Sequence, residues 1–210
     1  MYTPKHFEPE DRTAILAFMQ RYSFATLVTA APGAAPTATH LPFMLEERRG
    51  ALWLAAHMAR ANPQWQHFGQ GEALVIFQGP HAYISPRWYD AAMSVPTWNY
   101  AAVHACGQPI RIESEAAVFA QLEKLIRASE PEYLAQWDQL PEDYKTSLAK
   151  GLVAFEMEIT RLEGKEKMSQ NRTDKEIRQV LEGLEASAHE SHREMAALMR
   201  EKYAGGSRNI

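Results

Sequence analysis

The sequence has few of the features that mark secreted, membrane-spanning or nucleic-acid-binding proteins. Its 210 residues contain one cysteine, Cys106, so no disulfide can form within the chain, which fits a reducing compartment. No apolar run approaches the roughly 20 residues that span a bilayer, and the first residues lack the basic-then-apolar order of a signal peptide. We therefore expect a cytoplasmic protein.

The chain also lacks a basic excess. Lys and Arg total 22 against 26 Asp and Glu, which gives a formal net charge of −4 at pH 7. Proteins that gain binding energy from phosphate contacts usually carry a basic face or stripe, so general nucleic-acid affinity is not indicated. HExxH, Cys/His zinc, GxGxxG, GxxxxGK[ST] and GxSxG motifs are absent from the sequence, and we expect no metal site.

The chain does contain a series of short strand-like runs between turn residues. We expect strands at 25–30, 37–45, 51–56, 73–78, 81–85, 103–113 and 152–160. The Gly79-Pro80 pair separates two of these runs. Short strands, hairpin-length turns and the lack of βαβ order predict a mainly β fold, an antiparallel barrel with α decorations.

Helical patterns are expected at 9–22, in an insertion at 114–150, and in a last helix at about 174–202. Ser114 is a candidate N-cap, and Thr173 with Glu176 forms a capping box. The 163–172 segment between the last strand and the last helix is expected to be a loop. The predicted single domain spans 1–210, with barrel strands in about 24–113 and 152–161.

Two segments near predicted strand ends carry polar residues that a core alone does not require. After the 51–56 strand, Arg60 and Asn62 can aim a guanidinium and loop N–H groups at an anion. The alternative is a solvated loop in which Arg60 faces water. In the second segment, 79–89, Pro86 interrupts the chain beside Arg87 at a strand end.

Two further segments supply aromatic and cationic side chains. The 97–100 segment places a hydroxyl, an indole, an amide and a phenol in four consecutive residues, which suits a flat heterocycle with polar edges; a rigid turn is the alternative. The 163–172 segment supplies donors ahead of a helix N-terminus, where an anionic group can dock. A solvated basic loop is the alternative there.

Through these segments the chain resembles a known family. The blocks that carry the resemblance are Thr39-His-Leu-Pro-Phe43, Asn62-Pro-Gln-Trp65, Gly79-Pro-His-Ala-Tyr-Ile-Ser-Pro86, Val95-Pro-Thr-Trp-Asn-Tyr100 and Lys167-Met-Ser-Gln-Asn-Arg172. They are similar to the signature blocks of PaiB-like proteins, described as FMN-binding negative transcriptional regulators. The resemblance runs from residue 1 to about 182.

The resemblance implies a flavin-binding split β-barrel that forms a homodimer, with FMN in clefts at the subunit interface. Phosphate contacts are implied for 56–62. The 97–100 and 167–172 segments are the next choices, with a looser correspondence to the superfold. The predicted cofactor-binding residues are therefore Ala56, His57, Arg60, Asn62, Thr97, Trp98, Asn99, Tyr100, Lys167, Ser169, Gln170 and Arg172. The 37–43 strand lacks the arginine- and lysine-rich phosphate strand of related oxidases, which implies a weaker grip on the phosphate.

The expected function is that of a flavin-responsive regulator. DNA is a partner by resemblance, although the 174–202 helix carries seven acids and five bases and no helix-turn-helix is visible. The alternative is an FMN-dependent oxidoreductase acting on a small molecule, with Tyr100 and His81 as first candidates for a proton donor. A third hypothesis is a haem-binding split barrel with a His ligand.

Overall fold

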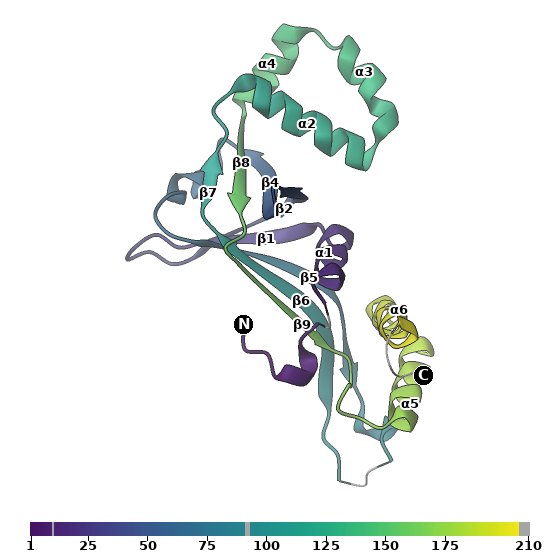
Figure 1. The fold of residues 1–210 in the computed structure, drawn as a ribbon. Coiled ribbons are helices and arrows are strands. Elements are labelled where there is room, and N and C mark those ends of the chain that lie inside the picture. Colours follow the sequence, from purple (N-terminus) through teal and green to yellow (C-terminus); the bar gives the residue numbers. More distant parts are fainter. Residues whose placement is uncertain (10, 91–92, 206–210) are drawn as a thin grey trace. The chain divides into compact units, whose positions relative to one another are not determined.

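A computed structural model describes residues 1–9, 11–90 and 93–205 (Figure 1). The chain divides into two compact units. The first unit comprises Met1–Phe18, Gln78–Val103 and Glu163–Ile210, and the second comprises Met19–Phe77 and His104–Leu162. Three strands, at 73–84, 97–107 and 161–167, run from one unit into the other, so no linker marks the division, and the single domain stays a prediction.

The strands form two antiparallel sheets. The five-stranded sheet has the order β2-β1-β5-β6-β9, and the four-stranded sheet has the order β3-β4-β8-β7. The strands are β1 (Phe24–Thr29), β2 (Thr37–Pro42), β3 (Met44–Arg48), β4 (Ala51–Ala59), β5 (Ala73–Ile84), β6 (Thr97–Gly107), β7 (Pro109–Arg111), β8 (Leu152–Glu158) and β9 (Arg161–Lys167). The predicted antiparallel β fold with helices is confirmed.

In the second unit, β4 and β8 form the centre of the four-stranded sheet. They pair over seven residues each, from Trp53 opposite Glu158 to Ala59 opposite Leu152. Alternation along β8 buries Phe155 and Met157 completely. The second unit therefore has an apolar core against which the end of β4 is fixed.

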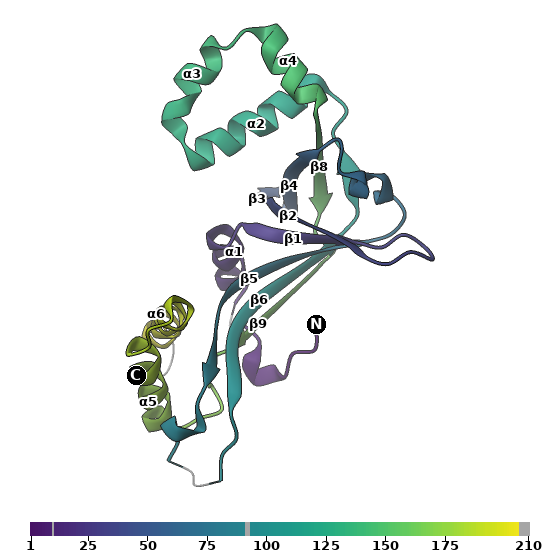
Figure 2. The ribbon, with the colours of Figure 1, turned by 180° about the vertical axis from the view of Figure 1, so that it is seen from behind.

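The predicted helical insertion also belongs to the second unit (Figure 2). It consists of α2 (Glu115–Ser129), a 3-10 turn (Pro131–Tyr133), α3 (Leu134–Gln139) and α4 (Glu142–Lys150). Ser114 stands at the N-cap position of α2, as predicted, although its side chain forms no capping bond. The insertion thus leaves the sheet after β7 and returns to it at β8.

In the first unit, α5 (Asp174–Glu185) and α6 (Glu190–Gly205) contribute half of the buried apolar side chains among the described residues. Ile177, Val180, Leu181 and Leu184 of α5 are buried, as are Met195 and Met199 of α6. The predicted capping box is present, with Thr173 Oγ1 accepting from the Glu176 N–H and Glu176 accepting from the Thr173 N–H. The N-terminal helix α1 spans Arg12–Arg21, within the predicted 9–22.

Four sequence predictions about strands were wrong. Gly79-Pro80 does not separate two strands, because β5 continues through it to Ile84. β1 pairs with Leu74–Ile76 of β5, so a proline past that stretch removes no donor from the β1 ladder. The 37–45 run is two strands, because β2 pairs with β1 whereas β3 pairs with β4. The predicted 103–113 strand is also two strands, since β6 ends at Gly107 and β7 begins at Pro109.

The fourth error concerns 163–172, which is strand β9 as far as Lys167 and not a loop. Five of the seven β9 residues are charged, and this composition hides the strand. The last helix was also wrongly predicted to be continuous. It ends at Glu185 and restarts at Glu190, because Ser187 Oγ accepts the His189 N–H and offers the backbone an alternative to the helix.

Candidate functional site at the end of strand β4

Residues 57–59 lie in β4 and not in the loop that was predicted to follow the 51–56 strand. β3 pairs with β4 only as far as Ala55, whereas β8 pairs with it as far as Ala59. The Ile159 N–H donates to the Leu52 carbonyl across the β8 side. Backbone N–H and C=O groups alternate between the two sides of a strand, so those of His57 and Ala59 point to the side of β4 that faces β3. At these two residues, however, β3 no longer pairs with β4.

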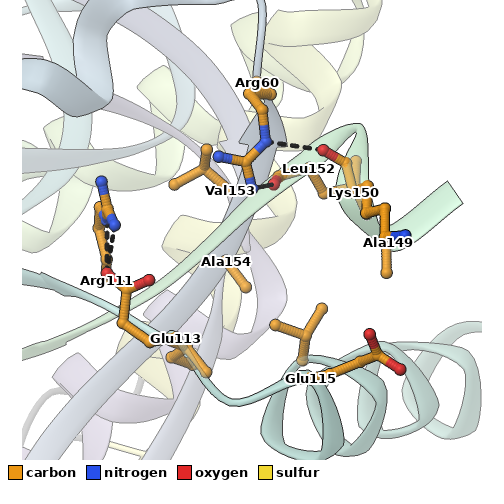
Figure 3. A pocket seen from close by; sticks show the side chains of 11 residues that line it. Arg60, Arg111, Glu113, Glu115, Ala149, Lys150, Leu152, Val153 and Ala154 are labelled. Carbon is orange, nitrogen blue, oxygen red and sulfur yellow. Dashed lines mark hydrogen bonds and ion pairs between the residues drawn. The ribbon is translucent and has the colours of Figure 1, made fainter. Parts of the chain in front are cut away.

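Arg60 follows the strand directly and folds toward β8. Its Nε donates to the Lys150 carbonyl at 2.7 Å, and its Nη2 donates to the Leu152 carbonyl at 2.8 Å (Figure 3). Among the described residues no carboxylate forms an ion pair with Arg60. The Arg60 side chain is therefore held in place by two backbone carbonyls, and no acidic side chain among the described residues balances its positive charge.

The Arg60 side chain lines a pocket of about 560 Å³, part of it open to solvent (Figure 3). Its other charged lining residues are Lys150, Arg111, Glu113 and Glu115. Arg111 is engaged by Glu113, with Nε 2.9 Å from Oε1, and its guanidinium lies 5.0 Å from the centre of the Trp65 ring. Arg60 and Lys150 are therefore the cations best able to bind an anion there, and this donor set fits a phosphate group.

Two predicted residues near Arg60 have different roles. Asn62 caps the 3-10 helix Pro63–His67, with Oδ1 accepting from the Gln64 N–H at 3.0 Å. Its Nδ2 donates to Thr39 Oγ1 at 2.9 Å, so the side chain is engaged in holding this turn. His57 is half-buried, and burial lowers the pKa of its imidazole below the usual value of 6.5. At neutral pH His57 is thus uncharged.

Gln121 is a residue of this region that the sequence reasoning missed. It is the buried residue of α2, and its Nε2 donates to the Ala56 carbonyl at 2.7 Å. Its position three residues after Val118, on the apolar side of the helix, was the available signal. The side chain ties the insertion to the strand that carries the candidate site.

In the first unit, the 97–100 segment opens β6 and is not a turn. Asn99 is fully buried, and its Nδ2 donates to Ser169 Oγ at 2.9 Å. Lys167 Nζ donates to Thr97 Oγ1 at 2.5 Å. The structure therefore joins the predicted 97–100 and 167–172 segments to each other by side-chain hydrogen bonds.

In the 168–172 turn, most of the side-chain donors that suggested an anion site have partners within the protein. The Gln170 side chain accepts from the Met168 N–H at 2.6 Å and donates to the Glu166 carbonyl. Ser169 is buried in the left-handed region, with φ 67°. Arg172 stacks with its guanidinium carbon 3.8 Å from the centre of the Tyr89 ring. This turn has the contacts of a rigid structural element.

Trp98 and Tyr100 point away from Asn99, as alternation along a strand requires. Trp98 is 46% exposed, and its Nε1 donates to His81 Nδ1 at 3.2 Å. The Tyr100 ring centre lies 5.3 Å from Lys165 Nζ. With Tyr83, which is 42% exposed, these side chains form an aromatic surface on the first unit.

The described part of the chain offers neither a metal site nor a membrane-spanning helix. Over residues 1–9, 11–90 and 93–205, no three His, Cys, Asp or Glu side chains are grouped so that they could hold a metal ion. Within the same residues, no helix has the length and apolar character needed to cross a membrane.

Comparison with known proteins identifies relatives along nearly the whole chain. A family model described as "Putative FMN-binding domain" matches residues 1–161. The chain is 37% identical over 206 residues to the protease synthase and sporulation protein PAI 2 of Bacillus subtilis, covering 96% of this chain and 98% of that protein. It is 33% identical over 204 residues to uncharacterized protein AN0679 of Emericella nidulans, covering 78% and 81%.

Solved structures show the same fold at low identity. The flavocytochrome Anf3 from Azotobacter vinelandii gives a TM-score of 0.61 at 16% identity, covering 82% of this chain and 73% of that one. A FAD- and haem-binding protein from Mycobacterium smegmatis gives 0.60 at 16% identity, covering 81% and 78%. The predicted split β-barrel is confirmed, and the family match supports FMN as the cofactor.

Proposed function

The chain belongs to the PaiB-like family of FMN-binding domains, and from this premise we propose that it is a cytoplasmic, homodimeric, flavin-responsive regulator that holds the FMN phosphate at Arg60. FMN supplies a redox-active ring when it is bound. The residues of the chain supply the grip on its phosphate and the response to its presence.

One observation carries the phosphate assignment: Arg60 is a fixed guanidinium without an acidic partner among the described residues. A guanidinium has five N–H bonds, and two N–H groups of Arg60 donate to the Lys150 and Leu152 carbonyls. The remaining N–H bonds are available for phosphate oxygens. Lys150, in the same pocket, adds a second positive charge.

The extent of the family match favours the same choice. Residues 56–62 and 97–100 lie inside the matched 1–161 range. Lys167, Ser169, Gln170 and Arg172 lie outside it, and each has an internal contact in the first unit. We therefore place the phosphate at Arg60, and keep Ala56, His57, Trp98 and Tyr100 as predicted contacts for the rest of the cofactor.

The regulatory part of the proposal does not require α6 to enter a DNA groove. The exposed charged residues along α6 are of mixed sign: Glu190, Arg193, Glu194, Arg200 and Glu201. A recognition helix normally presents a basic surface to DNA. We infer that any effect on transcription passes through a protein partner or through flavin occupancy.

The homodimer rests on the exposed aromatic side chains of the first unit, Tyr83 and Trp98, since aromatic residues are enriched in protein interfaces. Light scattering of the purified protein is expected to return twice the mass of one chain. A monomer at micromolar concentration would overturn this part of the proposal.

The phosphate assignment is tested by titrating FMN and riboflavin into wild type and Arg60→Ala. Loss of one charge-assisted contact is expected to weaken FMN binding roughly ten- to a hundredfold, equivalent to about 1.5–3 kcal/mol. Riboflavin, which lacks the phosphate, should bind more weakly to wild type and be indifferent to the substitution. Equal affinity of wild type for the two flavins would refute the assignment.

Arg111→Ala is the matched control for that titration. Arg111 lines the same pocket, but its guanidinium is engaged by Glu113, so its loss should leave the preference for FMN over riboflavin nearly unchanged. The absorption spectrum of the purified protein and an assay of reduction by NAD(P)H complete the test. A Soret band would support the haem hypothesis, and steady NAD(P)H oxidation would support the oxidoreductase.

A further inference from the structure

The helical insertion of the second unit has very little core of its own. Each of its helices α2, α3 and α4 buries a single residue: Gln121, Trp137 and Lys145 respectively. By contrast, α5 in the first unit buries five residues. An element with few buried apolar contacts opens locally at low free-energy cost, so the insertion is the less stable of these helical elements.

Polar side chains hold the insertion to the sheet in place of a core. Gln121 of α2 donates to the Ala56 carbonyl at 2.7 Å. Lys124 of α2 donates to Glu46 of β3 at 2.8 Å, although Lys124 is 54% exposed. At the other end of the insertion, Arg60 is the side chain that binds the Lys150 and Leu152 carbonyls.

The Arg60 contact is a helix C-cap made by a distant residue. Lys150 is the last residue of α4, and the last carbonyls of a helix have no partner within it. A cation at this end also interacts favourably with the helix dipole. The same guanidinium therefore caps α4 and, under the proposed function, faces the FMN phosphate.

We propose that the insertion, residues 115–150, is the flavin-responsive element, and that the FMN phosphate tightens it by fixing Arg60 against the C-terminal end of α4. This inference rests on the proposed function. A phosphate held by the spare N–H bonds restricts the guanidinium further, so the two carbonyl bonds are kept at a lower cost in side-chain entropy. By linkage, closure of the insertion and FMN binding strengthen each other.

Amide hydrogen exchange on the full chain, without ligand and with FMN or riboflavin, tests this coupling. With free FMN at about ten times its Kd, exchange of the α4 amides should slow by up to about tenfold, since local opening must first release the ligand. Riboflavin should slow it little. Amides of α5 should not respond and serve as an internal reference.

Variants separate capping from phosphate binding. Arg60→Lys keeps a positive charge but lacks the planar fork, so it should retain part of the FMN affinity while the protection of α4 by FMN disappears. Lys124→Ala, which removes only the exposed contact to Glu46, should retain the full FMN effect on α4. Arg60→Ala should show fast exchange of α4 under all three conditions.

Two outcomes would overturn different claims. If wild type binds FMN more tightly than riboflavin, but its α4 amides exchange at the same rate with either flavin bound, the proposed coupling is wrong and the phosphate site stands. If wild type does not distinguish the two flavins, the proposed phosphate site itself is wrong, and the inference falls with it.

Discussion

Two donor-rich segments of the molecule, 56–62 in the second unit and 167–172 in the first, look alike in sequence and differ in structure. Both include the end of a strand, and both contain arginine, a side-chain amide and several N–H donors. In the first, Arg60 donates to two backbone carbonyls and keeps spare N–H donors. In the second, Gln170 binds the turn itself and Arg172 lies on Tyr89.

The two segments differ in the partners of their hydrogen-bond donors. The 168–172 turn must reverse the chain between β9 and α5 in a buried setting, so its polar groups satisfy one another and the neighbouring strand. The end of β4 is covered by an insertion with few buried residues, and its cation keeps capacity for an outside ligand. A count of donors in a sequence cannot distinguish these two cases.

Among the substitutions that test this comparison, the largest change in stability is expected at Asn99. Asn99→Ala removes the hydrogen bond to Ser169 inside the first unit and leaves a buried hydroxyl without that partner. The free energy of unfolding should fall by about 1–3 kcal/mol in urea denaturation. The ratio of FMN to riboflavin affinity of the folded protein should stay as in wild type.

Asn62→Ala is the matched comparison, because both asparagine side chains form two hydrogen bonds. The second bond of Asn99 goes from its Nδ2 to Met199 Sδ at 3.6 Å. Asn62 is only half-buried and acts as an N-cap, so its loss should cost about 1 kcal/mol. If Asn62→Ala proves as destabilising as Asn99→Ala, the second unit is as rigid at this point as the first, and the contrast between the segments is lost.

The sequence predicted the elements whose signals are local. The capping box at Thr173 and Glu176 and the alternation in β8 both appear in the structure, because each depends on neighbouring residues only. β9 was missed since its charges concealed the strand, and the break at Ser187 was missed since the helical stripe continues past it. Those two outcomes depend on tertiary partners that a sequence window does not contain.

The candidate site was predicted in part for the same reason. The cation at Arg60 and the strand before it were found from residue type and position. Gln121 was missed because its partner, the Ala56 carbonyl, is 65 residues away. The roles of Asn99 and Ser169 were likewise hidden, because burial and not composition makes them structural.

A smaller effect is expected from Arg172→Ala. This change removes the stacking on Tyr89 and the 3.9 Å ion pair with Glu176. The cation–π contact is worth about 0.5–2 kcal/mol, so unfolding should become slightly easier. Unlike Arg60→Ala, the variant should bind FMN and riboflavin with the wild-type preference. A selective loss of FMN affinity would restore 167–172 as a phosphate site.

The smallest effect is a pH dependence that separates His57 in the second unit from His192 in the first. Burial lowers the pKa of His57, and burial together with the charges of His189 and His81 lowers the pKa of His192. The unfolded chain has an ordinary histidine pKa of about 6.5. As pH falls below that value, the two histidines bind protons more readily in the unfolded chain than in the folded protein. Their contribution to the free energy of unfolding is therefore fully present above about pH 6.5 and is lost as pH falls toward the lowered pKa values of the folded protein.

His57→Gln should remove the second unit's share of this acid sensitivity, and His192→Gln should remove the share of the first. Urea denaturation between about pH 7.5 and about pH 5 measures each share as the change in slope of unfolding free energy against pH. If the His57→Gln curve stays parallel to that of wild type, the imidazole of His57 titrates freely. The end of β4 would then be open to water around His57, and the half-buried strand end argued above would be wrong.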